Sequence, residues 1–285
     1  MKKLVISLVA ASLLCGTSLV AQTSKEVKDS ALKSAKIEAK DSNYKIVKEA
    51  LNSVVLTKKV LLDLEKNDKK QAVKDLENAI GKLEVILAKK DMPKLLPVDV
   101  SVNATEYIGT PKTVKESVSI VRSLLDKGKV QEARKVLMAL KSEIDIISVN
   151  LPLASYPDAL KLAANYLHDN NIESAKSVLY TALNTLVQEV VVVPIPLLKA
   201  EALIESASKI AKKDKEQALK HLSAAKDELK VSETLGYLSS SDTTYKVLDD
   251  KISEIEKEIK GKNRAEKLFD DLKSKLLSLK SKLIK

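Results

Sequence analysis

The apolar positions of the chain recur as a narrow stripe of Ala and Leu. Each copy has Ala first, Leu four residues on, a mostly small residue at seven and Leu or Ile at eleven. At about 100° per residue these offsets fall within about 60° of one another, so each copy predicts one side of an α-helix. The four copies are Ala72, Leu76, Ala79 and Leu83; Ala133, Leu137, Leu140 and Ile144; Ala175, Leu179, Ala182 and Leu186; and Ala218, Leu222, Ala225 and Leu229.

Each stripe is preceded by a second predicted helix and a turn. An apolar residue that ends the first helix lies eight positions before each first Ala: Leu64, Leu125, Leu167 and Ile210. The residues between carry turn chemistry, as in Asn67-Asp68 and Lys127-Gly128-Lys129. Successive first Ala residues are 61, 42 and 43 positions apart. This period is typical of stacked two-helix repeats.

The segments between the hairpins are rich in Pro and Val. The first, between Met92 and Pro111, lengthens the first interval and alternates valine with polar residues at positions 98–102, as a strand does. A second linker spans positions 149–157, and a third carries four consecutive valines at 190–193. Because β-branched residues are crowded in a helix, we predict a short β pairing between the first and third linkers.

Two flanking segments are also predicted to be helical. Residues 25–50 form an amphipathic helix through Val27, Ala31, Ala35 and Ala39. Residues 246–285 form amphipathic helices interrupted at Gly261, with apolar residues at alternating steps of three and four, as in coiled coils. The second of these helices carries a seam that either packs back on the body or joins subunits: Leu268, Leu272, Leu276, Leu279 and Leu283.

The first 21 residues have the pattern of a signal peptide. Lys2 and Lys3 precede an apolar run that ends at Leu14, and we predict cleavage after Ala21. Cys15 is the only cysteine, so the mature chain would have none, which suits an oxidising compartment. We therefore expect a periplasmic protein with a helical-repeat domain at 22–245 and C-terminal helices at 246–285.

Composition narrows the class of protein further. The 285 residues include only 3% aromatic side chains, six Gly and seven Pro, which favours a mainly all-α fold over a β-sandwich or a Rossmann enzyme. The formal net charge is +10, but Lys alternates with Glu and Asp along the predicted helices. With three Arg and no aromatic residues among the lysines, this charge does not predict nucleic-acid binding. We expect no membrane-surface contact either.

The residue chemistry predicts no enzyme. A mature chain with no cysteine and two histidines, His168 and His221, cannot form a Cys or multi-His metal site, and no phosphate-binding Gly loop or nucleophile elbow is present. We predict no cofactor. Four tyrosines in the linkers either wedge loops against helix pairs or line a binding site between repeats: Tyr107, Tyr156, Tyr237 and Tyr245.

Four short strings carry a family resemblance. They are Leu95-Leu96-Pro97-Val98-Asp99-Val100, Asn150-Leu151-Pro152-Leu153-Ala154-Ser155-Tyr156-Pro157, Val193-Pro194-Ile195-Pro196-Leu197-Leu198-Lys199-Ala200-Glu201 and Leu235-Gly236-Tyr237. In this order, across residues 45–260, the chain resembles the YfdX family of bacterial exported proteins. The resemblance implies a helical periplasmic protein, often oligomeric and linked to stress tolerance, with chaperone-like or small-molecule-binding behaviour.

Two functions remain open from the sequence. One is a non-enzymatic scaffold that binds unfolded protein clients or small amphiphilic molecules in grooves between hairpins. The other is a structural or assembly protein that forms homo-oligomers through its C-terminal helices and acts through a partner.

Overall fold

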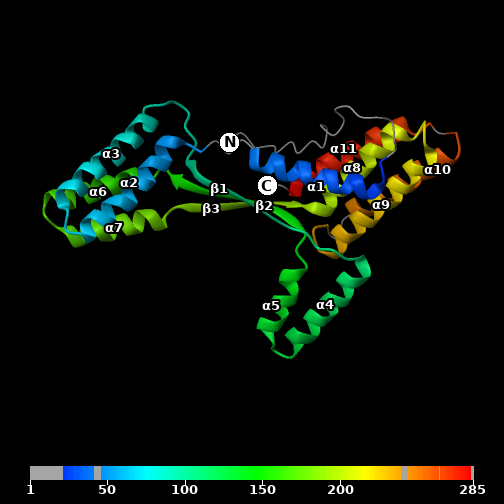
Figure 1. Ribbon diagram of the computed structural model, residues 1–285, viewed down its shortest axis with the longest axis horizontal. Helices are drawn as coiled ribbons and strands as arrows, with labels where there is room; N and C mark the ends of the chain where they lie inside the picture. Colours follow the sequence, from blue (N-terminus) through cyan, green and yellow to red (C-terminus); the bar gives the residue numbers. More distant parts are fainter. Residues whose placement is uncertain (1–21, 42–45, 239–242, 263, 284–285) are drawn as a thin grey trace. The chain divides into compact units, whose positions relative to one another are not determined.

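The chain folds into helical hairpins joined by strands (Figure 1). The computed structural model describes residues 22–41, 46–238, 243–262 and 264–283. The helices are α1 (Ser24–Asp41), α2 (Lys48–Glu65), α3 (Lys69–Leu87), α4 (Pro111–Asp126), α5 (Val130–Ala139), α6 (Tyr156–His168), α7 (Ile172–Asn184), α8 (Ile195–Ile210), α9 (Lys215–Thr234), α10 (Thr243–Lys260) and α11 (Glu266–Leu283). The strands are β1 (Leu95–Thr105), β2 (Glu143–Pro152) and β3 (Val187–Pro194). The predicted mainly all-α fold with a small β component is confirmed.

The hairpin turns form where the sequence predicts them. Three of the turns place one residue at a positive φ, at Asn67, Gly128 and Asn170, a conformation that Asn and Gly tolerate best. In the turns before α3 and α7 the next residue caps the following helix, as when the Asp68 carboxylate accepts from the Gln71 amide at 3.0 Å. Local turn chemistry is therefore enough to place these reversals.

The sheet corrects the predicted strand pairing. We predicted that the strands of the first and third linkers, β1 and β3, pair with each other. The strand order is β1-β2-β3, so each of them pairs with β2 and they are not neighbours. Bonds beyond the ends of β2 fit antiparallel pairing, since the Leu153 amide donates to Lys94 O and the Ile195 amide donates to Ser142 O. The prediction was wrong because β2 begins at Glu143, in a segment that we had assigned to the second helical stripe.

The chain divides into two compact units. Unit 1 comprises the described residues of 43–101 and 146–190 and holds hairpins α2–α3 and α6–α7. These hairpins pack on each other, α3 against α6 and α2 against α7. Their stripes meet in one core in which Ala side chains let the helices approach closely: Ala72, Leu76, Ala79, Leu83, Ala175, Leu179 and Ala182.

Unit 2 is built around hairpin α8–α9. It comprises the described residues of 4–42, 102–145 and 191–285. Helices α1 and α10 contact α9, and α1 and α11 contact α8, so helices cover this hairpin on several sides. Val27 and Ala31 of α1 join the fourth stripe in this core. The N-terminal helix was predicted over residues 25–50, but α1 ends at Asp41 and α2 begins at Lys48. The C-terminal residues, which the sequence sets apart as a separate segment, thus pack with α8 and α9 in unit 2.

The predicted signal peptide, residues 1–21, lies outside the described residues. Among the described helices, none combines the length and the apolar character needed to cross a membrane.

Candidate functional site

Tyr156 is the most deeply buried of the four candidate tyrosines. It is the first residue of α6, and its ring lies in the core of unit 1. Burial raises the pKa of Tyr156 to about 12, and the neighbouring Thr57 hydroxyl partly offsets that rise. This tyrosine therefore fills the bundle interior and presents nothing to a ligand.

Tyr237 ties the end of α9 to the start of β2. Its hydroxyl accepts from the Ser142 amide at 2.9 Å and donates to the Glu143 carboxylate at 2.6 Å. Burial, together with the Glu143 carboxylate, raises the pKa of Tyr237 well above its ordinary value. Lys141 bridges the carboxylates of Glu143 at 3.0 Å and Asp145 at 2.5 Å. One ammonium faces two carboxylates, so these three side chains carry a net charge of −1. The cluster acts as a clamp that holds the end of α9 to the start of β2.

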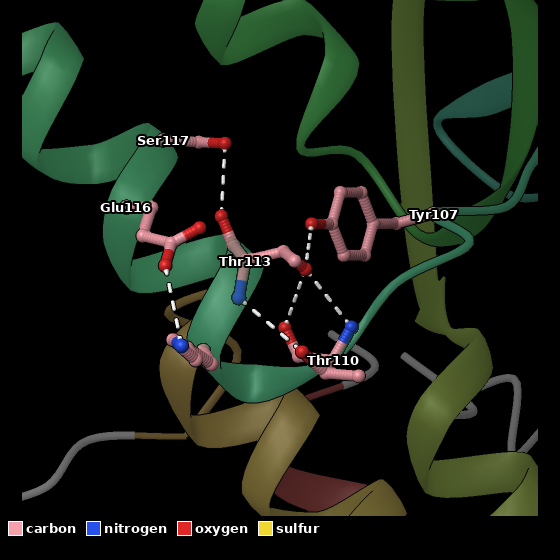
Figure 2. A network of polar contacts seen from close by, with 6 residues as sticks. Tyr107, Thr110, Thr113, Glu116 and Ser117 are labelled. Carbon is pink, nitrogen blue, oxygen red and sulfur yellow. Dashed lines mark hydrogen bonds and ion pairs between the residues drawn. The ribbon is translucent and has the colours of Figure 1, made fainter.

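The remaining two tyrosines also have structural partners. Figure 2 shows Tyr107 beside the start of α4, where its hydroxyl and the Thr113 hydroxyl lie 2.7 Å apart. Thr110 and Thr113 form a reciprocal capping box, which satisfies free amides at that helix end. Tyr245 on α10 lies under the ammonium of Lys230, 4.9 Å from the ring centre. Each of the four tyrosines thus has its own set of structural contacts.

The predicted oligomer seam packs within the chain. Leu272, Leu276 and Leu279 of α11 are buried in the core of unit 2, and Leu268 packs against it. Phe269 is buried there too, although it was not among the residues of the seam that the spacing of three and four predicted. The Leu283 side chain lies outside the described residues. The described seam residues therefore pack within their own chain and stabilise unit 2.

His221 is the one described histidine with a buried ring. Its Nδ1 lies 2.9 Å from the Ser24 hydroxyl, and its Nε2 is buried without a hydrogen-bond partner. Burial lowers the pKa of His221, against a smaller opposing effect of Asp214. Ser24 and His221 link α1 to α9. The described residues contain no group of three or more His, Cys, Asp or Glu side chains placed to hold a metal.

The α4–α5 hairpin differs from the other three hairpins in the exposure of the leucine at the second position of the repeat. The exposed apolar residues of its two helices are Ile120, Leu125, Val130, Leu137 and Met138. Leu137 is 49% exposed, whereas Leu76, Leu179 and Leu222, at the same position of the repeat, are at most 1% exposed. Val114, Val121 and Ala133 are buried but join neither of the two cores. The repeat had led us to place Leu137 in a buried stripe, so this surface was missed.

One side of α5 concentrates this surface. Val130, Arg134, Leu137 and Met138 follow the spacing i, i+4, i+7 and i+8, so at about 100° per residue they share one helix face. All four are exposed, while the small residue Ala133 is buried. We call these four residues the α5 face. The second stripe departs from the other three in the sequence, because Leu140 stands where they have alanine, but this change alone does not indicate that Leu137 is exposed.

The comparisons with known proteins place the chain in a family. Residues 50–192, half of the chain, match the family model described as YfdX protein. The chain belongs to the YfdX family. The YfdX match runs from α2 to β3 and ends before the third and fourth strings that suggested the resemblance. Among solved structures, Salmonella Typhi YfdX is similar at 11% identity, with a TM-score of 0.36, over 52% of this chain and 91% of that chain. None of the curated proteins matches.

Proposed function

We propose that this YfdX-family protein is a non-enzymatic, stress-associated scaffold with chaperone-like action. It binds apolar segments of partly unfolded client proteins on the α5 face. The observation that supports this is the 49% exposure of Leu137 on α5, whereas Leu76, Leu179 and Leu222, at the same position of the other three hairpins, are buried. Contiguous exposed apolar side chains on a folded protein commonly mark interaction sites.

The alternative of an assembly protein acting through its C-terminal helices has less support. Leu272, Leu276 and Leu279 lie in the core of their own chain. Pulling them out to join subunits would expose that core to water, at about 1.5 to 3 kcal/mol for each side chain. A homo-oligomer remains a prediction, but it needs another surface.

Export to the periplasm is part of the proposal and has a direct test. The full chain is expressed in a Gram-negative host, and the protein recovered by osmotic shock is weighed by mass spectrometry. We expect a chain that starts at Gln22, since cleavage is predicted after Ala21. Recovery of the uncleaved chain from the cytosol alone would contradict this part.

Aggregation of an unrelated client tests the function. The protein is mixed at equal molar amounts with thermally unfolding citrate synthase, and light scattering is followed. We expect suppression by the unmodified chain and at least half of that suppression to be lost in the double variant Leu137→Ser, Met138→Ser. The matched control is Leu62→Ser, Leu277→Ser, because both leucines are similarly exposed on other helices. No suppression by the unmodified chain would remove the chaperone-like function.

A further inference from the structure

We infer that the α5 face selects an acidic, amphipathic helical segment as its partner. This inference rests on the proposed function and names the chemistry of the client segment. It depends on three features of the hairpin: the spacing of the exposed apolar residues, the position of Arg134 among them, and the net charge of the hairpin.

The repeat indicates that the occupant is a helix. In unit 1 the stripe of hairpin α2–α3 is covered by helices α6 and α7, and in unit 2 hairpin α8–α9 is covered by α1, α10 and α11. The apolar residues of the α5 face, at i, i+7 and i+8, also share one side of a helix, and within the described part of the chain no other hairpin covers them. Ridges spaced this way accept the side chains of another helix. Ten residues of α5 offer a length of about 15 Å, which matches roughly three turns of a partner.

The charge of the hairpin indicates that the partner is acidic. Residues 111–139 hold seven Lys or Arg against three Asp or Glu, a net charge of +4. By the same count hairpins α2–α3 and α8–α9 each carry +1, and α6–α7 carries −1. A second copy of the hairpin would therefore bring +4 against +4, whereas an acidic segment would be attracted. The α4–α5 hairpin, which carries the α5 face, is thus the most basic of the four described hairpins.

Arg134 supplies a specific contact for a carboxylate. It lies between Val130 and Leu137 on the α5 face and is exposed. Within the described part of the chain it has no ion-pair partner. The nearby Glu132 is already bound by Lys129 at 3.1 Å. An arginine among exposed apolar residues is typical of residues that dominate binding energy in protein interfaces. Its planar fork can bind a carboxylate through two parallel hydrogen bonds.

Two synthetic peptides test the inference. Both are helices of about 18 residues with the same leucine stripe, long enough to cover α5, and their polar positions are all Glu in one and all Lys in the other. Binding of each fluorescein-labelled peptide to the full chain is measured by anisotropy at about 50 and about 300 mM salt. We expect the Glu peptide to bind at least about tenfold more tightly than the Lys peptide, with a difference that shrinks as salt screens the charges.

Charge reversal at one residue locates the contact. Arg134→Glu should weaken the binding of the Glu peptide by about tenfold, because it removes the guanidinium that binds a carboxylate and adds a carboxylate that repels the peptide. Arg264→Glu is the matched control, since it makes the same charge change at an exposed arginine outside the hairpin. We expect that control to change binding less than about threefold. Equal losses in both variants would indicate nonspecific attraction and overturn the inference.

The remaining outcomes separate the inference from the proposed function. In one outcome the unmodified chain suppresses client aggregation, the variant Leu137→Ser, Met138→Ser does not, and the Glu and Lys peptides bind with equal affinity. The proposed function then stands, and the inferred selection for acidic segments is wrong. If sedimentation shows a dimer that Leu137→Ser abolishes, the occupant is a second copy and the inference is overturned. If anionic phosphatidylglycerol vesicles displace the Glu peptide and bind more tightly, the face is a membrane contact and the inference is again overturned.

Discussion

Hairpins α4–α5 and α8–α9 carry the same sequence repeat and differ in their surroundings. Leu222 of α9 is fully buried beneath neighbouring helices, while Leu137 of α5, at the equivalent position, is 49% exposed. Both hairpins form, and both reverse at short turns. The repeat therefore specifies a helical hairpin, and the elements packed around it decide whether its apolar stripe becomes core or surface.

The largest expected effect comes from truncating the two equivalent leucines. Leu222→Ala should lower the free energy of unfolding by about 2 to 5 kcal/mol, because it leaves a cavity in the unit 2 core. Leu137→Ala should change it by less than about 0.5 kcal/mol, because that side chain is half-exposed. Urea unfolding followed by circular dichroism measures both. Similar losses in the two variants would show that α5 is covered in solution and would break the comparison.

The second prediction concerns the ion pair between the α4–α5 hairpin's entry segment and α8. Glu106, just before α4, binds the ammonium of Lys199, which is largely buried. Glu106→Gln leaves that charge without its carboxylate and should cost about 1 to 3 kcal/mol, less than a fully buried pair because Glu106 is partly exposed.

Glu116→Gln is the control for this prediction. Its partner Lys112 lies on the same exposed helix face at 4.0 Å, so no measurable change is expected on urea unfolding. A Glu106→Gln variant as stable as the unmodified chain would show that the entry segment is not anchored through this pair.

The third prediction concerns the clamp at the end of α9. Tyr237→Phe removes the hydroxyl that binds the Ser142 amide and the Glu143 carboxylate, and should cost about 1 to 2 kcal/mol. Tyr180→Phe, which loses one bond to exposed Glu65, serves as the control. If both variants unfold at the same urea concentration, the Tyr237 contacts do not hold α9 to β2.

The smallest effect expected is the pH dependence that His221 contributes. Because burial lowers its pKa in the folded chain, the unfolded chain binds the proton more readily, and stability rises with pH. This contribution is complete above the unfolded pKa of about 6.5 and is lost as pH falls toward the lowered folded value. His221→Asn, which keeps a polar atom near Ser24, should flatten the stability profile between about pH 7 and pH 5. An unchanged slope would contradict the assignment.

Local features of the sequence predict much of the fold. Stripes such as Ala218 to Leu229 and turns such as Asn67-Asp68 lie where expected, because they depend on neighbours within a few residues. Strand β2 was missed because Ile144 satisfies both a helical and a strand period. The Tyr237 bond to Ser142 joins residues 95 positions apart, which no local pattern indicates. The exposure of Leu137 depends on which helices lie elsewhere in unit 2, and the repeat carries no information about that.

Hydrogen exchange on the full chain with a bound client segment is the most direct test of the α5 face. The Glu peptide is added at saturation, and amide exchange is compared by mass spectrometry with and without it. We predict slower exchange in Val130–Ala139 of α5 and no change in Lys215–Thr234 of α9. Protection of α9 without protection of α5 would contradict binding at the α5 face, and so would unchanged exchange along both helices.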